Sequence, residues 1–347
     1  MEDTRKALLA QYSFFTLHLS RLKCLCSLIL GLIQVRRVTL NSLALCFEGS
    51  ASQDSKTKRI SRFLSSFCFP YEAMSRYIWS RFATDEATVL SLDRINWKFG
   101  QLNINILMLS ICYRGYGIPL IWKLLDKQGN SSQAERISLM ERFLATIHTD
   151  QVVRLVADRE FIGAKWLNWL DDHHVHYIIR IRANQYLEPE NGTAKQARSL
   201  FGACSWKTLR KARNLKGVWV FVGGQKLPNG DYLILVSNIP IQRGRHYYTK
   251  RWDIEILFGA LKTRGFNFED THLTDYQRIE AMIGLLGLAF AWVVLVGDWI
   301  SQGGKTIPIK KHGRKAKSIF RTGLDLIRHK LFNHRALTYE IHLLSGT

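Results

Sequence analysis

The pattern of apolar and polar positions between residues 87 and 182 predicts five strands. Three apolar runs come first, separated by short polar stretches: ATVLSLD at 87–93, INILMLSICYR at 104–114 and GIPLIWKLLD at 117–126. Short connections between such runs are typical of an antiparallel meander. Two more apolar runs follow, QVVRLVAD at 151–158 and VHYIIRIR at 175–182.

Helical periodicity fills the two gaps between the later strands. Ser132 and Glu135 have the spacing of a capping box, and the apolar residues after them share one helical face, so a helix is predicted over 132–148. A second helix has Trp166 and Leu170 on its apolar side. The resulting order, β-β-β-α-β-α-β, predicts an α/β fold with the mixed sheet of the ribonuclease H-like topology.

Two aspartates end strands of this predicted sheet. Asp93 is the last residue of the first run, and Asp158 is the last residue of the fourth. A right-handed crossover makes these strands parallel, and ligand sites in such sheets lie at the carboxyl ends of the strands. We therefore expect the two carboxylates side by side, although either aspartate alone also fits an ordinary turn residue or helix N-cap.

A polar stripe is predicted in the later segment YYTKRWDIEILFGALKTRG, at 247–265. Tyr248, Arg251, Glu255 and Lys262 are spaced at offsets 0, 3, 7 and 14. On an α-helix these offsets fall within an arc of about 60°. A carboxylate between cations suits a metal ion beside a phosphate. The alternative is an exposed helix in which Arg251 and Glu255 form an i,i+4 ion pair.

Three carboxylates are thus candidates for one catalytic site. Asp93, Asp158 and Glu255 would give the hard oxygen ligands that two divalent cations need for in-line phosphoryl transfer. Glu160 shares the strand face of Asp158 and is a candidate additional ligand. Asp253 lies about 140° from the stripe and should point away.

Three blocks of the sequence resemble a known family. LDRINWKFG, ADREFIG and Y-x2-R-x3-E-x6-K are similar to the catalytic blocks of insertion-sequence family four, the cut-and-paste DDE transposases of bacterial composite transposons. The similarity runs from about residue 85 to 270. It implies that Asp93, Asp158 and Glu255 bind two Mg²⁺ ions, which Mn²⁺ can replace. It also implies that the DNA is cut at the element's end through a hairpin intermediate.

The same resemblance assigns roles to the other members of the stripe. It implies that Tyr248 and Lys262 contact the phosphates of the terminal nucleotides, with Arg251 as a further phosphate or structural contact. Its partners would be double-stranded DNA, as terminal inverted repeats and as target, and a second copy of the chain in a homodimeric synaptic complex.

Residues 186–245 are predicted to form a β-rich insertion. Two alternating runs are joined through PNGD at 228–231, which is a strong hairpin signal. Between residues 191 and 252 there are twelve Lys and Arg against one acid, so this part is expected to lie against nucleic-acid backbone. The resemblance implies a Trp that stacks where a base is flipped out. Trp219 and Trp206 are the candidates, and the position of Trp219 in mid-strand also fits the core.

The first 80 residues are predicted to be helical and to bind the transposon end. Three helices are expected, at 21–33, at 40–47 and from about residue 55. The third has one apolar stripe and a basic remainder that includes Lys58, Arg59 and Arg62. A tight turn before a basic amphipathic helix is typical of a helix-turn-helix DNA reader, although any small helical bundle has similar features. Residues 81–185 and 246–335 would then form the catalytic domain.

Composition agrees with a nucleic-acid partner. Forty-nine Lys and Arg against 28 Asp and Glu leave a net charge of +21, which also suits RNA or anionic membranes. The uncharged run at 281–297 is interpreted as a buried helix against the sheet and not as a membrane span. Residues 305–335 carry ten Lys and Arg against one acid, and we expect a partly packed helix that lines a DNA groove.

The six cysteines show no paired metal-ligand spacing, and no cleavable signal peptide is evident, so we expect a bacterial cytoplasmic, nucleoid-associated protein without membrane partners. Two other functions stay open. A ribonuclease H-like nuclease or resolvase would share the three carboxylates, and an inactive DNA-binding relic would share the basic surface.

Overall fold

The chain divides into two compact units in this computed structural model. The structure describes residues 2–67, 69–83, 88–148, 151, 153–303, 308 and 316–344. A helical unit comprises Met1–Arg81, Lys98–Leu102 and Phe258–Thr347, and a sheet unit comprises Phe82–Trp97 and Asn103–Leu257. The boundary at Arg81 is one residue from the predicted one at residue 80, whereas no boundary falls at the predicted residues 185 and 245. The division by function remains a prediction.

The sheet unit has the predicted order of elements. Its first five strands are β1 Thr88–Phe99, β2 Leu102–Tyr113, β3 Tyr116–Leu124, β4 Val153–Ala157 and β5 His176–Arg180, with helices α6 Gln133–Thr146 and α7 Ala164–Asp172 between the later ones. The strands lie in the order β3-β2-β1-β4-β5-β11-β10-β8. β2 is antiparallel to β3, whereas β4 is parallel to both β1 and β5. A mixed α/β fold is therefore confirmed, and its ribonuclease H-like assignment remains a prediction.

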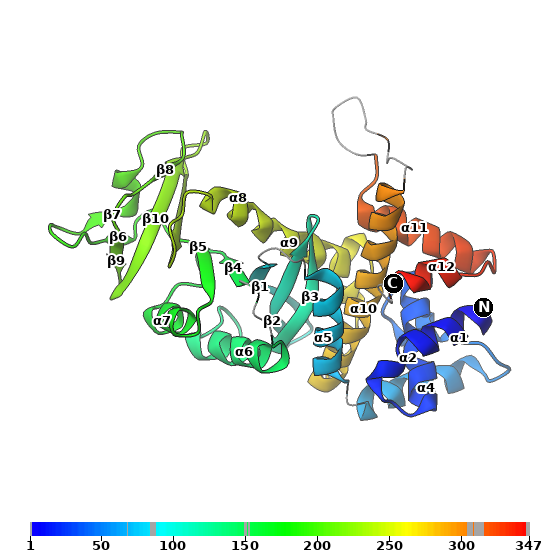
Figure 1. Ribbon diagram of the computed structural model, residues 1–347. Helices are drawn as coiled ribbons and strands as arrows, with labels where there is room; N and C mark the ends of the chain where they lie inside the picture. The colour runs from blue at the N-terminus through cyan, green and yellow to red at the C-terminus, as the bar shows by residue number, and fades with distance from the viewer. Residues whose placement is uncertain are drawn as a thin grey trace. The chain divides into compact units, whose positions relative to one another are not determined.

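Both faces of the sheet are covered, because its central strands are apolar on both sides. Helices α6 and α7 lie together on one side (Figure 1). The capping box that begins α6 is present, with Ser132 and Glu135 each accepting the other's backbone N–H. On the other side, Tyr248 and Ile241 pack with strand residues such as Val156.

The predicted hairpin of the insertion is present and extends the main sheet. β10 Val218–Lys226 and β11 Tyr232–Ser237 are antiparallel, and Gly230 in their turn has φ +88°. β11 also pairs with β5, so the insertion and the central sheet share hydrogen bonds. The other pieces are short: β6 Tyr186–Leu187, β7 Lys195–Gln196, η2 Ala197–Leu200, β8 Lys207–Thr208 and β9 Arg213–Leu215.

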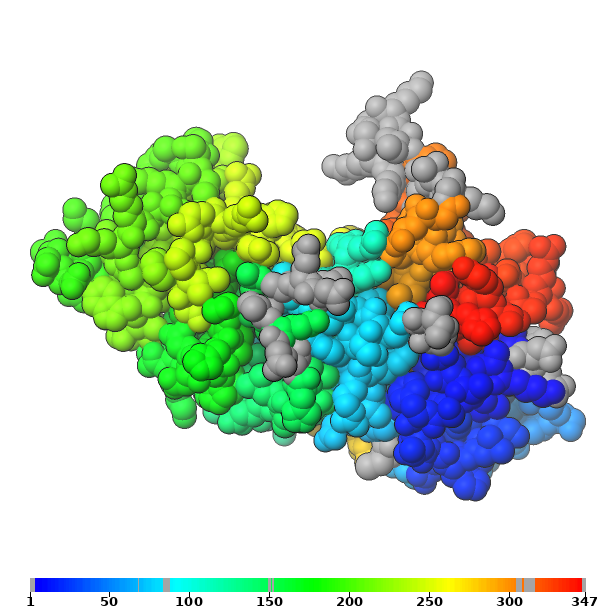
Figure 2. All heavy atoms as spheres, in the orientation of Figure 1, coloured from blue at the N-terminus to red at the C-terminus, as the bar shows by residue number. Residues whose placement is uncertain are grey.

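The helical unit combines both ends of the chain. Its elements are α1 Glu2–Gln11, η1 Ser13–Phe15, α2 Leu19–Val35, α3 Leu40–Ala44, α4 Gln53–Ser66, α5 Tyr71–Phe82, η5 Phe268–Asp270, α10 Tyr276–Gln302, α11 Ile319–Phe332 and α12 Thr338–His342. The helices predicted near residues 21, 40 and 55 are thus α2, α3 and α4. Figure 2 shows the first helices, in blue, directly against the C-terminal helices, in red, and α1 does contact α12.

Helix α10 is the centre of this unit. Among the described residues it is the one helix long and apolar enough to cross a membrane, and 94% of its most apolar stretch is buried. The predicted burial is confirmed, but its neighbours within the unit are α2, α4 and α11, where we expected the sheet. In α11, Phe320, Leu324 and Ile327 are buried as the packed-helix interpretation requires. Ile307 and Ile309, apolar positions of the same predicted helix, lie outside the described residues.

Candidate active site

Asp93 and Asp158 are brought together by the register of two parallel strands. Leu92 of β1 is paired with Ala157 of β4, so the two aspartates are the next residues along. Side chains alternate between faces along a strand, and neighbouring strands lie about 4.8 Å apart. The two carboxylates therefore occupy one face of the sheet at adjacent positions, as the strand pattern predicts.

One detail of this prediction is wrong. β1 does not end at Asp93 but continues to Phe99. Its pairing with β4 stops at Leu92. Asp93 thus marks the place where the parallel part of the sheet ends.

Glu255 comes to the same place on an irregular helical segment. The segment consists of α8 Gly244–Tyr248, a 3-10 turn η3 Thr249–Arg251 and α9 Trp252–Gly259. Arg251 Nη1 lies 2.7 Å from Glu255 Oε1 and 3.7 Å from Asp93 Oδ2. Tyr248 donates a hydrogen bond of 3.3 Å from its hydroxyl to Asp158 Oδ1. Arg251 and Tyr248 thus link the three carboxylates. The i,i+4 ion pair of the alternative is present, but it does not lie on an exposed face, because Arg251 is 6% exposed.

Lys262 does not continue the stripe. Residues Ala260–Arg264 form a π-helical turn (η4) in which Lys262 has a non-helical ψ of −112°. Lys262 belongs to the helical unit and forms a 2.7 Å ion pair with Glu269. The prediction of one regular helix through all four residues is therefore wrong at its last member.

The electrostatics of the cluster are dominated by burial. Burial raises the pKa of Asp93 to about 6, opposed by the Arg94 backbone N–H and by Arg251, and reinforced by Glu160 and Glu255. Burial and the nearby Asp158 raise the pKa of Tyr248, which keeps its hydroxyl protonated as a donor.

Glu160 is already paired. Arg94 holds both of its carboxylate oxygens, at 2.7 and 2.9 Å, in the bidentate geometry typical of strong ion pairs. Arg94 also donates to Asn105, to Asn130 and to the Gly129 carbonyl. Arg94 is not among the predicted site residues, although its position directly after Asp93 is a signal in the sequence.

The carboxylates have the right chemistry for hard divalent cations, which take oxygen ligands. In the described part of the chain, however, no three His, Cys, Asp or Glu side chains are grouped closely enough to hold a metal ion. The Arg251 guanidinium lies between two of the acids as the shared counter-ion of Asp93 and Glu255. By its chemistry, the set of carboxylate oxygens fits a divalent cation.

Asp253 turns away from this cluster, as predicted. It is 6% exposed, and burial raises its pKa to about 6 against the opposing effects of Lys250 and of a hydrogen bond from the Gly115 backbone.

The other predicted DNA contacts lie apart from the acids in the sequence. Lys58, Arg59 and Arg62 are exposed on α4 of the helical unit. Trp219 is 51% exposed on β10, so the core alternative for it is wrong. Trp206 packs closely against Gly223.

Comparison with known proteins gives the following likenesses. The family model described as the transposase DDE domain matches residues 89–293, more than half of the chain. No curated protein sequence matches. A cryo-EM structure of a piggyBac transposase synaptic complex with hairpin DNA is 11% identical with a TM-score of 0.47, over 99% of this chain and 82% of that one. The crystal structure of endonuclease V from Bacillus subtilis is 7% identical with a TM-score of 0.25, over 59% and 85%.

Proposed function

The chain belongs to the DDE transposase family, and from that premise we propose that it excises and inserts a DNA element by cation-dependent cleavage and strand transfer. The observation that supports this most directly is that Arg251, Tyr248 and the pairing of β1 with β4 link Asp93, Asp158 and Glu255 within the matched region.

The three carboxylates would hold two Mg²⁺ ions, or Mn²⁺ in their place. Such a pair supplies an activated nucleophile and stabilises the leaving oxygen in an in-line displacement. Tyr248 keeps Asp158 oriented through its hydrogen bond, and Arg251 fixes Glu255 through its ion pair.

Arg251 also has capacity left for the substrate. Its Nε is buried and has no hydrogen-bond partner among the described residues. Its guanidinium is held over the Trp252 ring at 4.7 Å, which limits its rotamers. A phosphate oxygen next to the cut is the acceptor that this donor suits.

The proposed substrate is double-stranded DNA, first at the terminal inverted repeats of the element and then at the target. Cleavage would pass through a hairpin end, with Tyr248 and Lys262 on the terminal phosphates and Trp219 stacked on an unpaired base. Lys58, Arg59 and Arg62 would bind the transposon end. A homodimer in the bacterial cytoplasm, associated with the nucleoid, is part of this proposal. The net charge of +21 favours its association with nucleic acid.

The acids are tested by single substitutions. Replacing Asp93, Asp158 or Glu255 by Ala should reduce Mg²⁺-dependent cleavage of DNA that carries the element's ends by at least about 1000-fold, because each removes a ligand of the reacting centre. DNA affinity should change little, since it comes mainly from Lys and Arg. Asp253→Asn, on the same helix as Glu255, is the matched control and should cleave DNA at the normal rate.

Near-normal cleavage by Glu255→Ala would contradict the assignment. The same assay separates the rival functions. Cleavage without joining of the freed 3′-hydroxyl to target DNA would identify a nuclease or resolvase, and DNA binding without any cleavage would identify an inactive relic.

A further inference from the structure

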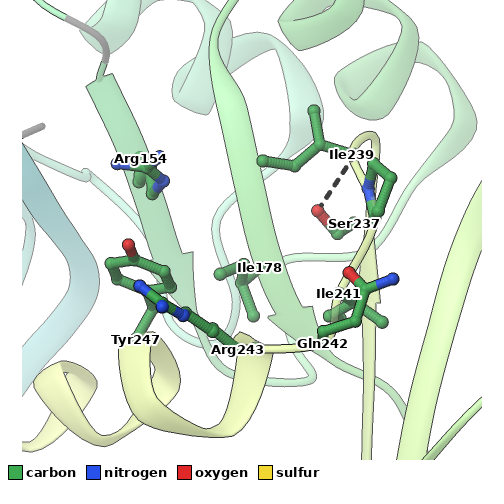
Figure 3. Close-up of a pocket in the computed structure, with 10 residues that line it drawn as sticks. Arg154, Ile178, Ser237, Ile239, Ile241, Gln242, Arg243 and Tyr247 are labelled. Carbon is green, nitrogen blue, oxygen red and sulfur yellow. Dashed lines mark hydrogen bonds between the residues drawn. The ribbon is translucent and has the colours of Figure 1, made fainter.

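A pocket opens on the face of the sheet that carries Asp93 and Asp158. It has a volume of about 360 Å³ and is lined by residues of β4, β5, β11 and the turn into α8 (Figure 3). Arg154 and Arg243 are among the lining residues, together with Tyr247, Pro240, Ser237 and Gln242. None of the lining residues is acidic.

Neither arginine has an acidic partner within the part of the chain that the structure describes. No described carboxylate forms an ion pair with Arg154 or Arg243. The Arg154 guanidinium lies 4.7 Å from the centre of the Tyr247 ring, and its Nε is buried without a hydrogen-bond partner in the described structure. A buried donor of this kind is costly unless a ligand satisfies it. Two unpaired guanidinium groups at one pocket therefore favour an anion, and their geometry suits phosphate.

The remaining lining suits what accompanies a phosphate in a nucleotide. Tyr247 and Pro240 offer flat surfaces, and Ile178 and Ile241 form an apolar wall. Ser237 and Gln242 add neutral polar groups. Ligand sites commonly have about 300–1,000 Å³, so this pocket has room for a group of about one nucleotide.

The pocket is connected to the acids through the fold. Arg154 and Asp158 are four residues apart on the same face of β4, which corresponds to about 13 Å along the strand. Tyr247 directly precedes Tyr248, whose hydroxyl contacts Asp158. A strand of DNA advances about 3.4 Å per nucleotide along the duplex axis, so a phosphate at the pocket lies within about four nucleotides of the cut.

We propose that the pocket binds one phosphate of the DNA substrate on Arg154 and Arg243, with the adjoining sugar or base against Tyr247. This inference rests on the proposed function, because it takes the substrate of the acids to be DNA.

The test uses the full chain and end DNAs that each carry one uncharged methylphosphonate within four nucleotides of the cut. In the wild type, one position should weaken binding about as much as Arg243→Ala does, by roughly 3- to 10-fold. In Arg243→Ala, a methylphosphonate at that position should cause no further loss of DNA affinity. Non-additive losses of this kind in a double-mutant cycle indicate a direct contact between Arg243 and that phosphate. The slope of log binding constant against log salt concentration should be smaller by about one in Arg243→Ala than in the wild type.

Arg245→Ala is the matched control. Arg245 is equally exposed on α8 but bonds Gln225 and does not line the pocket, so the sensitive methylphosphonate should still weaken this variant. Arg154→Lys keeps the positive charge but loses the planar guanidinium over the Tyr247 ring. This variant should bind DNA with reduced affinity and unfold at an unchanged temperature. If every methylphosphonate costs as much in Arg243→Ala as in the wild type, the proposal is overturned.

The two proposals fail separately. If cleavage depends on Glu255 but Arg243 shows no coupling to any phosphate, the proposed phosphate site is contradicted and the proposed function stands. If Arg243 is coupled to a phosphate but cleavage does not depend on Glu255, the phosphate site stands and the proposed function is contradicted.

Discussion

At the scale of single residues, Arg251 is the counter-ion that two of the candidate acids share. Its side chain is buried, and its Nη1 lies within ion-pair distance of both Asp93 and Glu255. Charges taken out of water are costly unless they are paired. The raised pKa of Asp93 indicates that one arginine offsets only part of that cost.

Asp253 provides a prediction on pH and stability. Its folded-state pKa of about 6 exceeds the ordinary value of 3.8, so the folded state holds this proton more tightly and the wild type loses stability as pH rises from about 4 to about 6. Asp253→Asn should therefore be more stable than the wild type at pH 7.5, by on the order of 1–2 kcal/mol. Urea unfolding at pH 7.5 and 4.5 measures this.

At pH 4.5 the advantage of Asp253→Asn should shrink, because the wild-type carboxyl is then largely protonated. Asp172→Asn, at an exposed position of α7, serves as the control for the same change of side chain at the surface. An advantage of equal size at both pH values would contradict the prediction.

Lys262 provides a second prediction at this scale. Lys262→Ala should slow cleavage about 10-fold or more while Mn²⁺ binding stays intact, because a cation near the cut positions phosphate and does not hold the metal. Glu269→Gln removes its ion-pair partner and keeps the lysine, so cleavage should persist. Cleavage rates measured with calorimetric Mn²⁺ titration distinguish these effects, and an unchanged rate in Lys262→Ala would refute the phosphate role.

At the scale of elements, α10 and α11 cross at two glycines. A methyl group on Gly297 would overlap the carbonyl oxygen of Ile319, and one on Gly323 would overlap that of Val293. The backbones therefore touch directly at this crossing. Small residues at both positions are what allows the apolar α10 to be buried so completely.

Gly297→Ala and Gly323→Ala should each lower the free energy of unfolding by about 3 kcal/mol or more, because the two helices must move apart. Gly31→Ala on α2 is the matched control. Its nearest neighbours lie 3.4 Å from an added methyl, so better helix propensity of about 1 kcal/mol can offset slight crowding. Thermal unfolding of the three variants measures this, and equal losses in all of them would contradict it.

At the scale of the whole molecule, the helical unit is built from distant parts of the chain. Helix α2 contacts α10 and α11 within this unit. Arg36 donates to the carbonyls of Arg264 and Gly265, and Arg328 donates to that of Gln34. The first 80 residues thus share one core with the last 90.

A fragment of residues 1–83 should therefore not unfold cooperatively by itself. Without residues 258–347 the fragment exposes apolar side chains of α2. Burial of one such side chain contributes about 1.5–3 kcal/mol, so exposing a few of them costs about as much as the free energy of unfolding of a whole domain. Circular dichroism during heating measures this. Mixing with a 258–347 fragment should restore a cooperative transition, and a sharp transition of the first fragment alone would contradict the prediction.

The order of strands and helices, and the adjacent positions of Asp93 and Asp158, follow from local patterns in the sequence. Apolar periodicity, the Ser132 capping box and the turn at Gly230 act over a few residues, so they can be read without the fold. The neighbouring positions of the aspartates follow from the same local signals, because a crossover helix fixes the direction of the fourth strand.

Which charged side chains are in contact, and what each end of the chain packs against, depend on the tertiary structure. The bridge from Arg251 to two acids, the departure of Lys262 to Glu269 and the pocket beside Arg154 each join side chains whose contacts depend on buried neighbours far away in sequence. The same holds for α10, whose apolar run fits a membrane span, a cover for the sheet or a helical core equally well. The burial of apolar surface is not directional. The apolar pattern therefore predicts that such a helix is buried, and the packing of the complete chain determines which elements bury it.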